Sequence, residues 1–272
     1  MIFHQIEFGP YKKGKFDEAY DLVDSYLSSL IRNGQIFYDT KIVPWQNKMY
    51  AYVDTAGPQA FLRKYHSAAG LEKLDVVKNY FNREPAWTVH EDSPPIREVS
   101  WKKASSLFLC TNHIEKASPI SLGDREATVP IYLLPLSDQL RDEIYCWQRA
   151  FHAVDQAWFD SETLETPAYR EMTDPQSTLS QNGRRLCTEI EKATEIRTYY
   201  YLHRFYCYED YEKEMCRPCP NCGKNWHVES YEGYPFGPFF QFGFRCESCR
   251  LVSHDGLHIS NRYAKIGDKF GK

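Results

Sequence analysis

The sequence lacks the short motifs that mark several large enzyme classes. It contains no Gly-x-Ser-x-Gly nucleophile elbow, no phosphate-binding Gly-Lys-Ser/Thr loop and no Gly-x-Gly-x-x-Gly dinucleotide fingerprint. The acidic residues Asp138, Asp142 and Glu143 are expected on a solvated helix face near the helix N-terminus, where negative charge is favourable. We therefore expect a protein that is not an enzyme, with no small-molecule substrate evident.

Long apolar runs are also missing. No stretch reaches the roughly 18 residues that a membrane-spanning helix requires. The first residues, Met1–Glu7, already include a charged residue and lack the basic start and apolar core of a signal peptide. The expectation is a soluble, cytoplasmic protein with no membrane partner.

Positive charge is not in surplus. The formal net charge is −4, and residues 216–272 hold eight Lys/Arg against five Asp/Glu, a balance of +3 that leaves −7 for residues 1–215. Zinc bound by four thiolates adds about −2, which lowers the C-terminal balance to roughly +1. A phosphate-binding domain ordinarily shows a clear cationic surplus, so charge does not favour nucleic-acid binding.

What the sequence does contain is a regular order of elements in its first third. The spacing of apolar residues predicts six elements in this order: a strand at 2–8, a helix at 16–30, strands at 35–43 and 48–54, and helices at 58–65 and 71–81. This order predicts an α+β fold with helices on one face of a sheet. Short strands are expected at 107–111 and 128–134, as an extension of that sheet, with a linker at 93–95.

Helices dominate the middle of the chain. Six apolar residues spaced by 4, 3, 4, 3 and 4 predict one helix over 140–158, and a second is expected over 177–194, before the tract Tyr199–Leu202. The predicted organisation is an α+β domain at 1–135, a helical region at 136–215 and a zinc-ribbon domain at 216–272.

Two closely paired cysteine motifs carry the strongest signal. Cys219 and Cys222 are separated by two residues, as are Cys246 and Cys249, and 23 residues lie between the pairs. Two such turns supply four sulfurs, which completes the tetrahedral coordination of one structural Zn²⁺ and leaves no position open for catalysis. Cys216 lies at a similar spacing from Cys219 but is expected to be a spare thiol. Cys110, Cys146, Cys187 and Cys207 are expected to pack in the core.

The segment between the cysteine pairs is rich in aromatic residues. Strands at 226–231 and 239–245 are expected to pair as a ribbon, with Phe240, Phe242 and Phe244 packing on one face. The alternative is that these rings stack on bases. The residues proposed to contact a partner are Trp226, Tyr234, Phe236, Arg245 and Arg250.

One coincidence suggests an enzyme. His113-Ile114-Glu115 and Pro218–Cys222 match the two halves of the zinc-deaminase signature. The halves lie about a hundred residues apart, too far for the single unit that builds such a site, and the second cysteine pair would have no role. A deaminase is therefore disfavoured.

The C-terminal half resembles a bacterial family of zinc-ribbon-containing, candidate nucleic-acid-binding proteins of unknown function. The resemblance rests on Leu179-Ser180, Gly183-Arg184, Cys187, Glu191 and Tyr199–Leu202, followed by Cys219–Gly223, Trp226 and the run from Phe242 to Ser253. It implies zinc at the four cysteines. The sequence departs from the family pattern in a longer segment near 231–237 and in the additional Cys216.

The sequence thus predicts a metal-stabilised recognition protein. A protein partner is favoured, because residues 1–215 are acidic and the ribbon is nearly neutral once zinc is counted; an inhibitor or immunity-type role against a basic partner would fit. The alternative is a nucleic-acid-binding protein that uses the ribbon, with rings stacked on bases and Arg245 and Arg250 on phosphates.

Overall fold

The computed structural model describes residues 2–37, 40–57, 59–90, 100–124, 127–161, 163–228 and 241–258. It is a mixed α+β protein in two compact units. Unit 1 contains residues 1–99, 116–118 and 130–145; unit 2 contains 100–115, 119–129 and 146–272. The three ranges expected from sequence differ from this division and stay a prediction, as does the linker at 93–95, which lies outside the described residues. Among the described helices, none has the length and apolar character needed to cross a bilayer.

Unit 1 is built on a four-stranded antiparallel sheet. Its order β2-β3-β1-β4 joins β1 (Ile2–Pro10), β2 (Lys41–Trp45), β3 (Lys48–Thr55) and β4 (Ala86–Val89). Helices α1 (Phe16–Arg32) and α2 (Ala68–Phe81) connect β1 to β2 and β3 to β4, with a 3-10 turn η1 (Arg63–Tyr65) before α2. This is the βαββαβ connectivity of the split βαβ motif.

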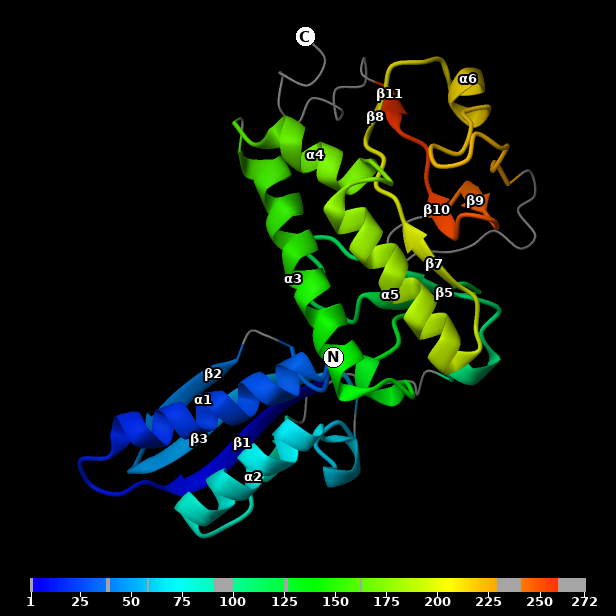
Figure 1. Cartoon of the computed structure of the whole chain (residues 1–272). Coiled ribbons are helices and arrows are strands. Elements are labelled where there is room, and N and C mark those ends of the chain that lie inside the picture. Colours follow the sequence, from blue (N-terminus) through cyan, green and yellow to red (C-terminus); the bar gives the residue numbers. More distant parts are fainter. Residues whose placement is uncertain are drawn as a thin grey trace. The chain divides into compact units, whose positions relative to one another are not determined.

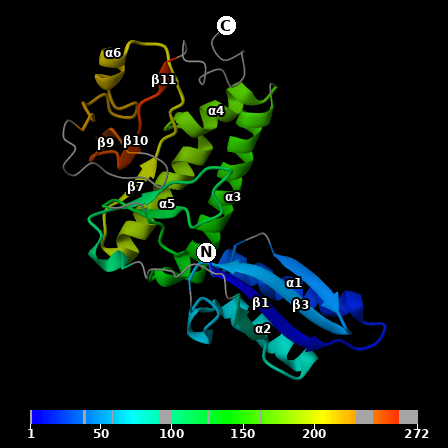
Figure 2. The ribbon, with the colours of Figure 1, turned by 180° about the vertical axis from the view of Figure 1, so that it is seen from behind.

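Both helices of unit 1 cover the same face of its sheet. Figure 1 shows α1 and α2 in front of the strands, and Figure 2 shows the strands from the other side. The period of two in β1 directs Ile2, His4, Ile6 and Phe8 toward the helices. Their partners include Val23, Leu27 and Leu30, one apolar stripe of α1. The expected sandwich with helices on one face is confirmed for this unit.

The sheet of unit 2 has five strands in the order β6-β5-β7-β10-β9. They are β5 (Leu107–Leu109), β6 (Ile120–Leu122), β7 (Thr198–Tyr201), β9 (Phe244–Cys246) and β10 (Leu251–Ser253). The strands β5, β7 and β10 run parallel, whereas β6 and β9 pair antiparallel at the two edges. A separate two-stranded sheet joins β8 (Tyr206–Cys207) to β11 (Leu257–His258).

Four helices belong wholly or partly to unit 2. They are α3 (Asp138–Asp160), which starts in unit 1, α4 (Glu165–Thr173), α5 (Thr178–Thr194) and the short α6 (Tyr211–Met215). Helix α5 packs along β7 and β5 (Figure 1). A Cβ atom on Gly183 would lie 2.2 Å from the ring of Tyr200, so α5 approaches this strand at a distance that only glycine permits.

The other face of this sheet is covered by aromatic packing. Phe108, Tyr199 and Tyr201 point to that face, and the ring of Phe242 lies against it, with ring centroids 5.1 Å from Phe108 and 5.3 Å from Tyr201. Phe242 and Phe244 are both fully buried. The expectation that the ribbon aromatics pack is confirmed for these two, while Phe240 lies outside the described residues.

Two expectations from sequence were wrong in this region. The strand expected over 128–134 is a single bridge at Thr128 followed by the 3-10 turn η3 (Ile131–Leu133), because Pro130 has no amide hydrogen to donate to a sheet. The strand at β5 belongs to the sheet of unit 2 and does not extend the first sheet. Cys110, Cys187 and Cys207 are buried as expected, but Cys146 is exposed.

Candidate metal centre

The first cysteine pair lies in a tight turn. The amide of Gly223 donates to the carbonyl of Cys219 at 2.8 Å, and the amide of Cys219 donates to the carbonyl of Lys224 at 2.8 Å. Gly223 has φ +72°, a left-handed conformation that glycine adopts without strain. The turn therefore brings the side chains of Cys219 and Cys222 to the same side.

The second pair lies in the turn between β9 and β10, which are paired from Phe244–Ser253 to Cys246–Leu251. Arg250 follows the second cysteine and has φ +53°, the same left-handed region as Gly223 after the first pair. A non-glycine residue is strained there. Arg250 is held in place by a two-pronged ion pair with Glu191 of α5, at 3.1 Å from Nε and 3.0 Å from Nη2.

The two turns bring four sulfur atoms together. The Sγ atoms of Cys219, Cys222, Cys246 and Cys249 all lie within 4.8 Å of one another, and none of the four is in a disulfide. The Sγ atoms of Cys222 and Cys246 are 3.7 Å apart. Metal–sulfur bonds of about 2.3 Å in a tetrahedron place sulfurs about 3.75 Å apart, so the arrangement fits one metal ion. Cys216 is exposed and is not part of this group, which agrees with its expected role as a spare thiol.

The protein environment shifts the pKa values of the cysteine thiols in different directions. The amide of Lys224 donates to Cys222 and lowers its pKa to about 6, whereas burial raises the pKa of Cys219 to about 12 and also raises that of Cys249. A bound cation would reverse the effect of burial, because it stabilises the thiolates directly. The side-chain amide of Asn221 also donates to Cys249 Sγ at 3.2 Å, the type of contact that orients a ligand.

The arginines next to the cysteines are paired with carboxylates. Arg245 Nε lies 2.6 Å from Glu247 Oε1, and its Nη2 donates to the hydroxyl of Tyr199 at 2.8 Å. That hydroxyl donates to Glu247 Oε2 at 2.6 Å. Arg245 and Arg250 were both expected to contact a partner. Both are instead paired with carboxylates of unit 2 in this structure.

The remaining expected contact residues differ in position. Trp226 is 2% exposed, and its indole N–H donates to the carbonyl of Arg217 at 3.0 Å. The guanidinium of Arg217 lies over the rings of Trp226 and Phe244, at 4.7 and 3.9 Å from their centroids. The structure therefore places Trp226 in packing, not at the surface. Tyr234 and Phe236 lie outside the described residues.

Sequence reasoning missed a buried polar cluster in unit 2. Asp155 accepts a hydrogen bond from the amide of His113 and lies 2.9 Å from its Nδ1, and His113 is not among the residues of the four-cysteine group. The hydroxyl of Tyr201 lies 3.2 Å from His203 Nδ1 and 3.3 Å from His254 Nδ1. Burial lowers the pKa of His203 to about 4, and the pKa of His254 well below its usual value. Scattered histidines give no spacing signal from which this cluster could be predicted.

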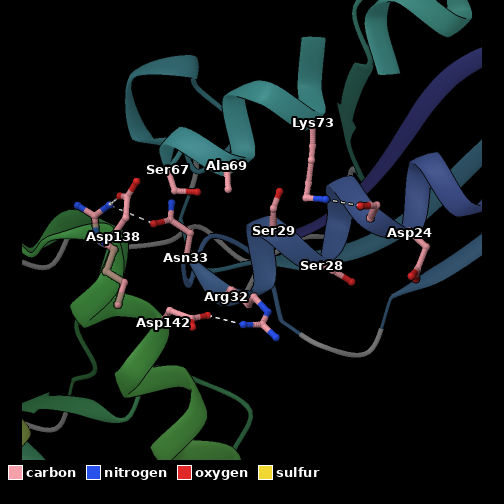
Figure 3. A pocket seen from close by; sticks show the side chains of 12 residues that line it. Asp24, Ser28, Ser29, Arg32, Asn33, Ser67, Ala69, Lys73, Asp138 and Asp142 are labelled. Carbon is pink, nitrogen blue, oxygen red and sulfur yellow. Dashed lines mark hydrogen bonds and ion pairs between the residues drawn. The ribbon is translucent and has the colours of Figure 1, made fainter. Parts of the chain in front are cut away.

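A polar pocket of about 490 Å³ lies in unit 1 between α1 and the first turns of α2 and α3 (Figure 3). Two ion pairs line it: Arg32 with Asp142 at 2.6 Å, and Arg141 with Asp138 at 3.1 Å. Lys73 donates to the hydroxyl of Ser25. These side chains of the pocket are therefore engaged within the chain, and no sequence motif signalled the pocket.

The chain is similar to proteins of unknown function. Residues 101–203 match the family described as a domain of unknown function (DUF2310), and residues 209–258 match a second one (DUF8594). An uncharacterised protein of Haemophilus influenzae (strain ATCC 51907 / DSM 11121 / KW20 / Rd) is 40% identical over 147 residues, which cover 54% of this chain and 69% of that protein. The chain belongs to this bacterial DUF2310/DUF8594 family.

A second uncharacterised protein of the same organism is also 40% identical over 147 residues, and there the chain spans about half of the relative's length, 54%. No solved structure matches. The DUF8594 range contains all four cysteines, and the two matched ranges begin at residue 101, after the strands of unit 1. A bacterial family is therefore shown, and the four-cysteine cluster is compatible with the zinc ribbon that the sequence suggested.

Proposed function

We propose that unit 2 is a zinc-stabilised recognition domain in which one Zn²⁺ is bound by Cys219, Cys222, Cys246 and Cys249. The observation that carries this proposal is the convergence of four sulfurs, in a group that includes no histidine or carboxylate. Four thiolates complete a tetrahedral site, so zinc bound there contributes folding energy and does not activate water. The proposed role is therefore recognition without catalysis.

The metal can be tested on the full chain. Metal analysis of protein purified without added zinc should give one zinc per chain, and Cys246→Ser should lose it. Cys216→Ser is the matched control and should retain one zinc, because this exposed thiol is not in the group. A different metal, or a chain that is folded and metal-free, would contradict the proposal.

The partner we propose is a basic protein. A hollow of about 250 Å³ beside α6 is lined by Glu209, Asp210 and Tyr211, among others. The ring of Tyr211 is 70% exposed, and Leu257 is 39% exposed nearby on β11. Glu209 is already paired with Lys213 at 3.0 Å. Asp210 beside an exposed aromatic ring suits a lysine or arginine side chain, which gains both charge pairing and a cation–π interaction. An inhibitor or immunity-type role would follow from such a surface.

Nucleic-acid binding by the ribbon is the alternative, and the local charges favour it less. Arg245 and Arg250 would have to leave Glu247 and Glu191 before they could bind phosphates. Each arginine would therefore break an existing ion pair in order to form a new one with a phosphate, which cancels much of the favourable charge interaction. The protein partner is the better-supported proposal.

Affinity capture at low salt from the native bacterium tests the partner. A basic protein should bind the wild-type chain, be released by salt, and bind a Tyr211→Ala/Asp210→Asn variant at least tenfold more weakly. Tyr20→Ala, an exposed ring on α1 of unit 1, is the matched control and should bind like wild type. Recovery of no stable partner, or equal binding by the double variant, would count against this surface.

A further inference from the structure

The face of the unit 1 sheet opposite to α1 and α2 carries a row of aromatic side chains. The pairing of β1 with β3 sets Phe3 opposite Asp54, Gln5 opposite Tyr52 and Glu7 opposite Tyr50. Side chains of directly opposed residues share a face, and successive residues alternate between faces. Since Ile2, His4, Ile6 and Phe8 point to the helices, Phe3, Tyr50 and Tyr52 point away from them.

The edge strands extend this row. Trp45 of β2 lies on the same face, with its ring centroid 6.2 Å from that of Tyr50, and His90 after β4 lies 5.8 Å from Phe3. Phe3 and Tyr52 are stacked at 6.0 Å with nearly parallel rings. Trp45 is 61% exposed and Phe3 39%, whereas Tyr50, between them, is 7% exposed. We call Trp45, Tyr50, Tyr52, Phe3 and His90 the aromatic row; it runs from β2 across β3 and β1 to the residue after β4.

Charge is divided between the two layers of this unit. The strands and the loop 10–15 carry five lysines, Lys12, Lys13, Lys15, Lys41 and Lys48, and two described carboxylates, Glu7 and Asp54. Helix α1 instead carries four carboxylates and one arginine. The amide of Tyr11 donates to the carbonyl of Asn47, so the lysine-rich loop lies next to the β2–β3 turn that follows Trp45. The loop lysines and Lys48 therefore lie near the Trp45 end of the aromatic row, whereas Lys41, which opposes Tyr52, lies further along it. Lys15 is also paired with Glu18 at 3.1 Å, and Lys12 Nζ lies over the ring of Tyr80 of α2.

One of the two carboxylates on this face, Glu7, is already neutralised; the other, Asp54, lies opposite Phe3. Glu7 accepts from Lys48 at 3.1 Å and from Arg83 at 3.0 Å, so these three groups together carry one positive charge. A bound polyanion would consequently meet no uncompensated negative charge from Glu7 at the centre of the face.

We propose that the aromatic row binds single-stranded RNA, with successive bases stacked on Trp45, Tyr52 and Phe3 and the phosphates near the lysines of β2, β3 and the loop 10–15. Exposed rings on a sheet with cationic groups alongside are the chemistry that binds unpaired bases without an extended sequence requirement. A duplex would hide its base faces from such a surface. Gln5 and Thr88, which oppose each other between the rings, offer hydrogen-bonding groups to the ribose 2′-hydroxyl.

Fluorescence anisotropy of the full chain with a labelled ten-nucleotide uridine oligomer tests the proposal, at about 50 mM salt, where phosphate contacts are strong. Trp45→Ala and Tyr52→Leu should each weaken binding at least fivefold, the lower end of what one stacked base contributes. Tyr52→Phe keeps the ring and should bind like wild type. Phe159→Ala removes an exposed ring from unit 2 and should also leave binding unchanged.

Two further measurements separate this surface from its rivals. Ultraviolet cross-links from a thiouridine oligomer should map to the peptide that contains residues 41–54. The affinity should fall with about the second power of salt concentration if about three phosphates are contacted. Cross-links confined to residues 209–258, no binding at low salt, indifference to Trp45→Ala and Tyr52→Leu, or equal affinity for the matching deoxyuridine oligomer would each overturn the proposal.

Discussion

The two units differ in whether their aromatic side chains are exposed and in whether their charged side chains are paired internally. In unit 1 one sheet face is packed on helices, while the other presents Trp45 and Phe3 to solvent. In unit 2 the sheet is covered by α5 on one face and by Phe242 on the other, and the arginines at its edge are paired internally. The charged groups at the sheet edge of unit 2 are thus engaged with one another, whereas the outer sheet face of unit 1 exposes two aromatic rings.

The units also differ in what stabilises them. The sheet and helices of unit 1 enclose a continuous apolar core that includes Ile6, Phe8, Leu27 and Val53. At the β9–β10 edge of unit 2, four cysteines converge where a core would otherwise be needed. This difference indicates that a change at the metal centre should affect one unit and spare the other.

Removal of the metal should give the largest effect. Structural zinc contributes about 10–16 kcal/mol of apparent binding energy at neutral pH, so Cys246→Ser or a chelator should disorder the β9–β10 hairpin and destabilise unit 2. Hydrogen exchange read by mass spectrometry should show lost protection in β7, β9 and β10 and retained protection in β1 and β3. Cys216→Ser should leave both units protected. Equal loss of protection in both units would show that they are not independent in stability.

A substitution at the α5–β7 contact should come next. Gly183→Ala places a methyl group 2.2 Å from the ring of Tyr200 and should cost about 3 kcal/mol, the upper part of the range for overpacking. Denaturant unfolding followed by tryptophan fluorescence measures this loss. Gly243→Ala is the control, because a Cβ there meets no atom within 4 Å. A cost below about 0.5 kcal/mol for Gly183→Ala would show that α5 can move away from the sheet at little expense.

Acidification should weaken unit 2 by a somewhat smaller amount. Burial lowers the pKa of His152 to about 4 in the folded protein, whereas in the unfolded chain this pKa has its ordinary value of about 6.5. Between these pH values His152 binds a proton in the unfolded chain but not in the folded protein. The stabilisation is therefore complete above about pH 6.5 and declines as the pH falls toward 4, by about 2 kcal/mol for this residue. Unfolding free energies measured from pH 7 to 4.5 should show this slope, and His152→Gln should reduce it.

The smallest effect is expected at the ion pair behind the second cysteine turn. Glu191→Gln should cost about 1 kcal/mol, since both partners are about one-third exposed and solvent weakens the Arg250–Glu191 pair. Thermal unfolding of unit 2 measures this cost. Glu189→Gln removes a carboxylate from a more exposed ion pair on the same helix and should cost less. The opposite order would show that the pair does not hold Arg250 in its left-handed conformation.

The sequence predicted those features that depend on local spacing. The apolar stripes of α1, α3 and α5 predicted these helices to within a few residues, and the two-residue spacing of the cysteines predicted that the four sulfurs would lie together. Strand β4 was missed because Ala86–Val89 is an edge strand that is largely exposed and shows no apolar alternation.

Features that depend on distant partners could not be predicted in this way. Nothing local indicates that β5 pairs with β7 about ninety residues later, or that β10 lies between β7 and β9. The burial of Trp226, which was expected as a contact residue, could not be predicted because it depends on Arg217, whose position over the ring no spacing rule encodes. Local patterns thus identified the four cysteines that lie together, and long-range packing decided which neighbours remain exposed.

The position of β10 has a consequence for the order of folding. The sheet of unit 1 is complete once residue 89 has been synthesised, whereas the sheet of unit 2 needs β10, residues 251–253, to be inserted beside β7. Pairings between segments far apart in the chain form slowly, and their strand edges stay unprotected in the meantime. On the ribosome, β5 and β7 must therefore wait for the second cysteine turn to emerge before β10 can pair with β7 and protect this edge.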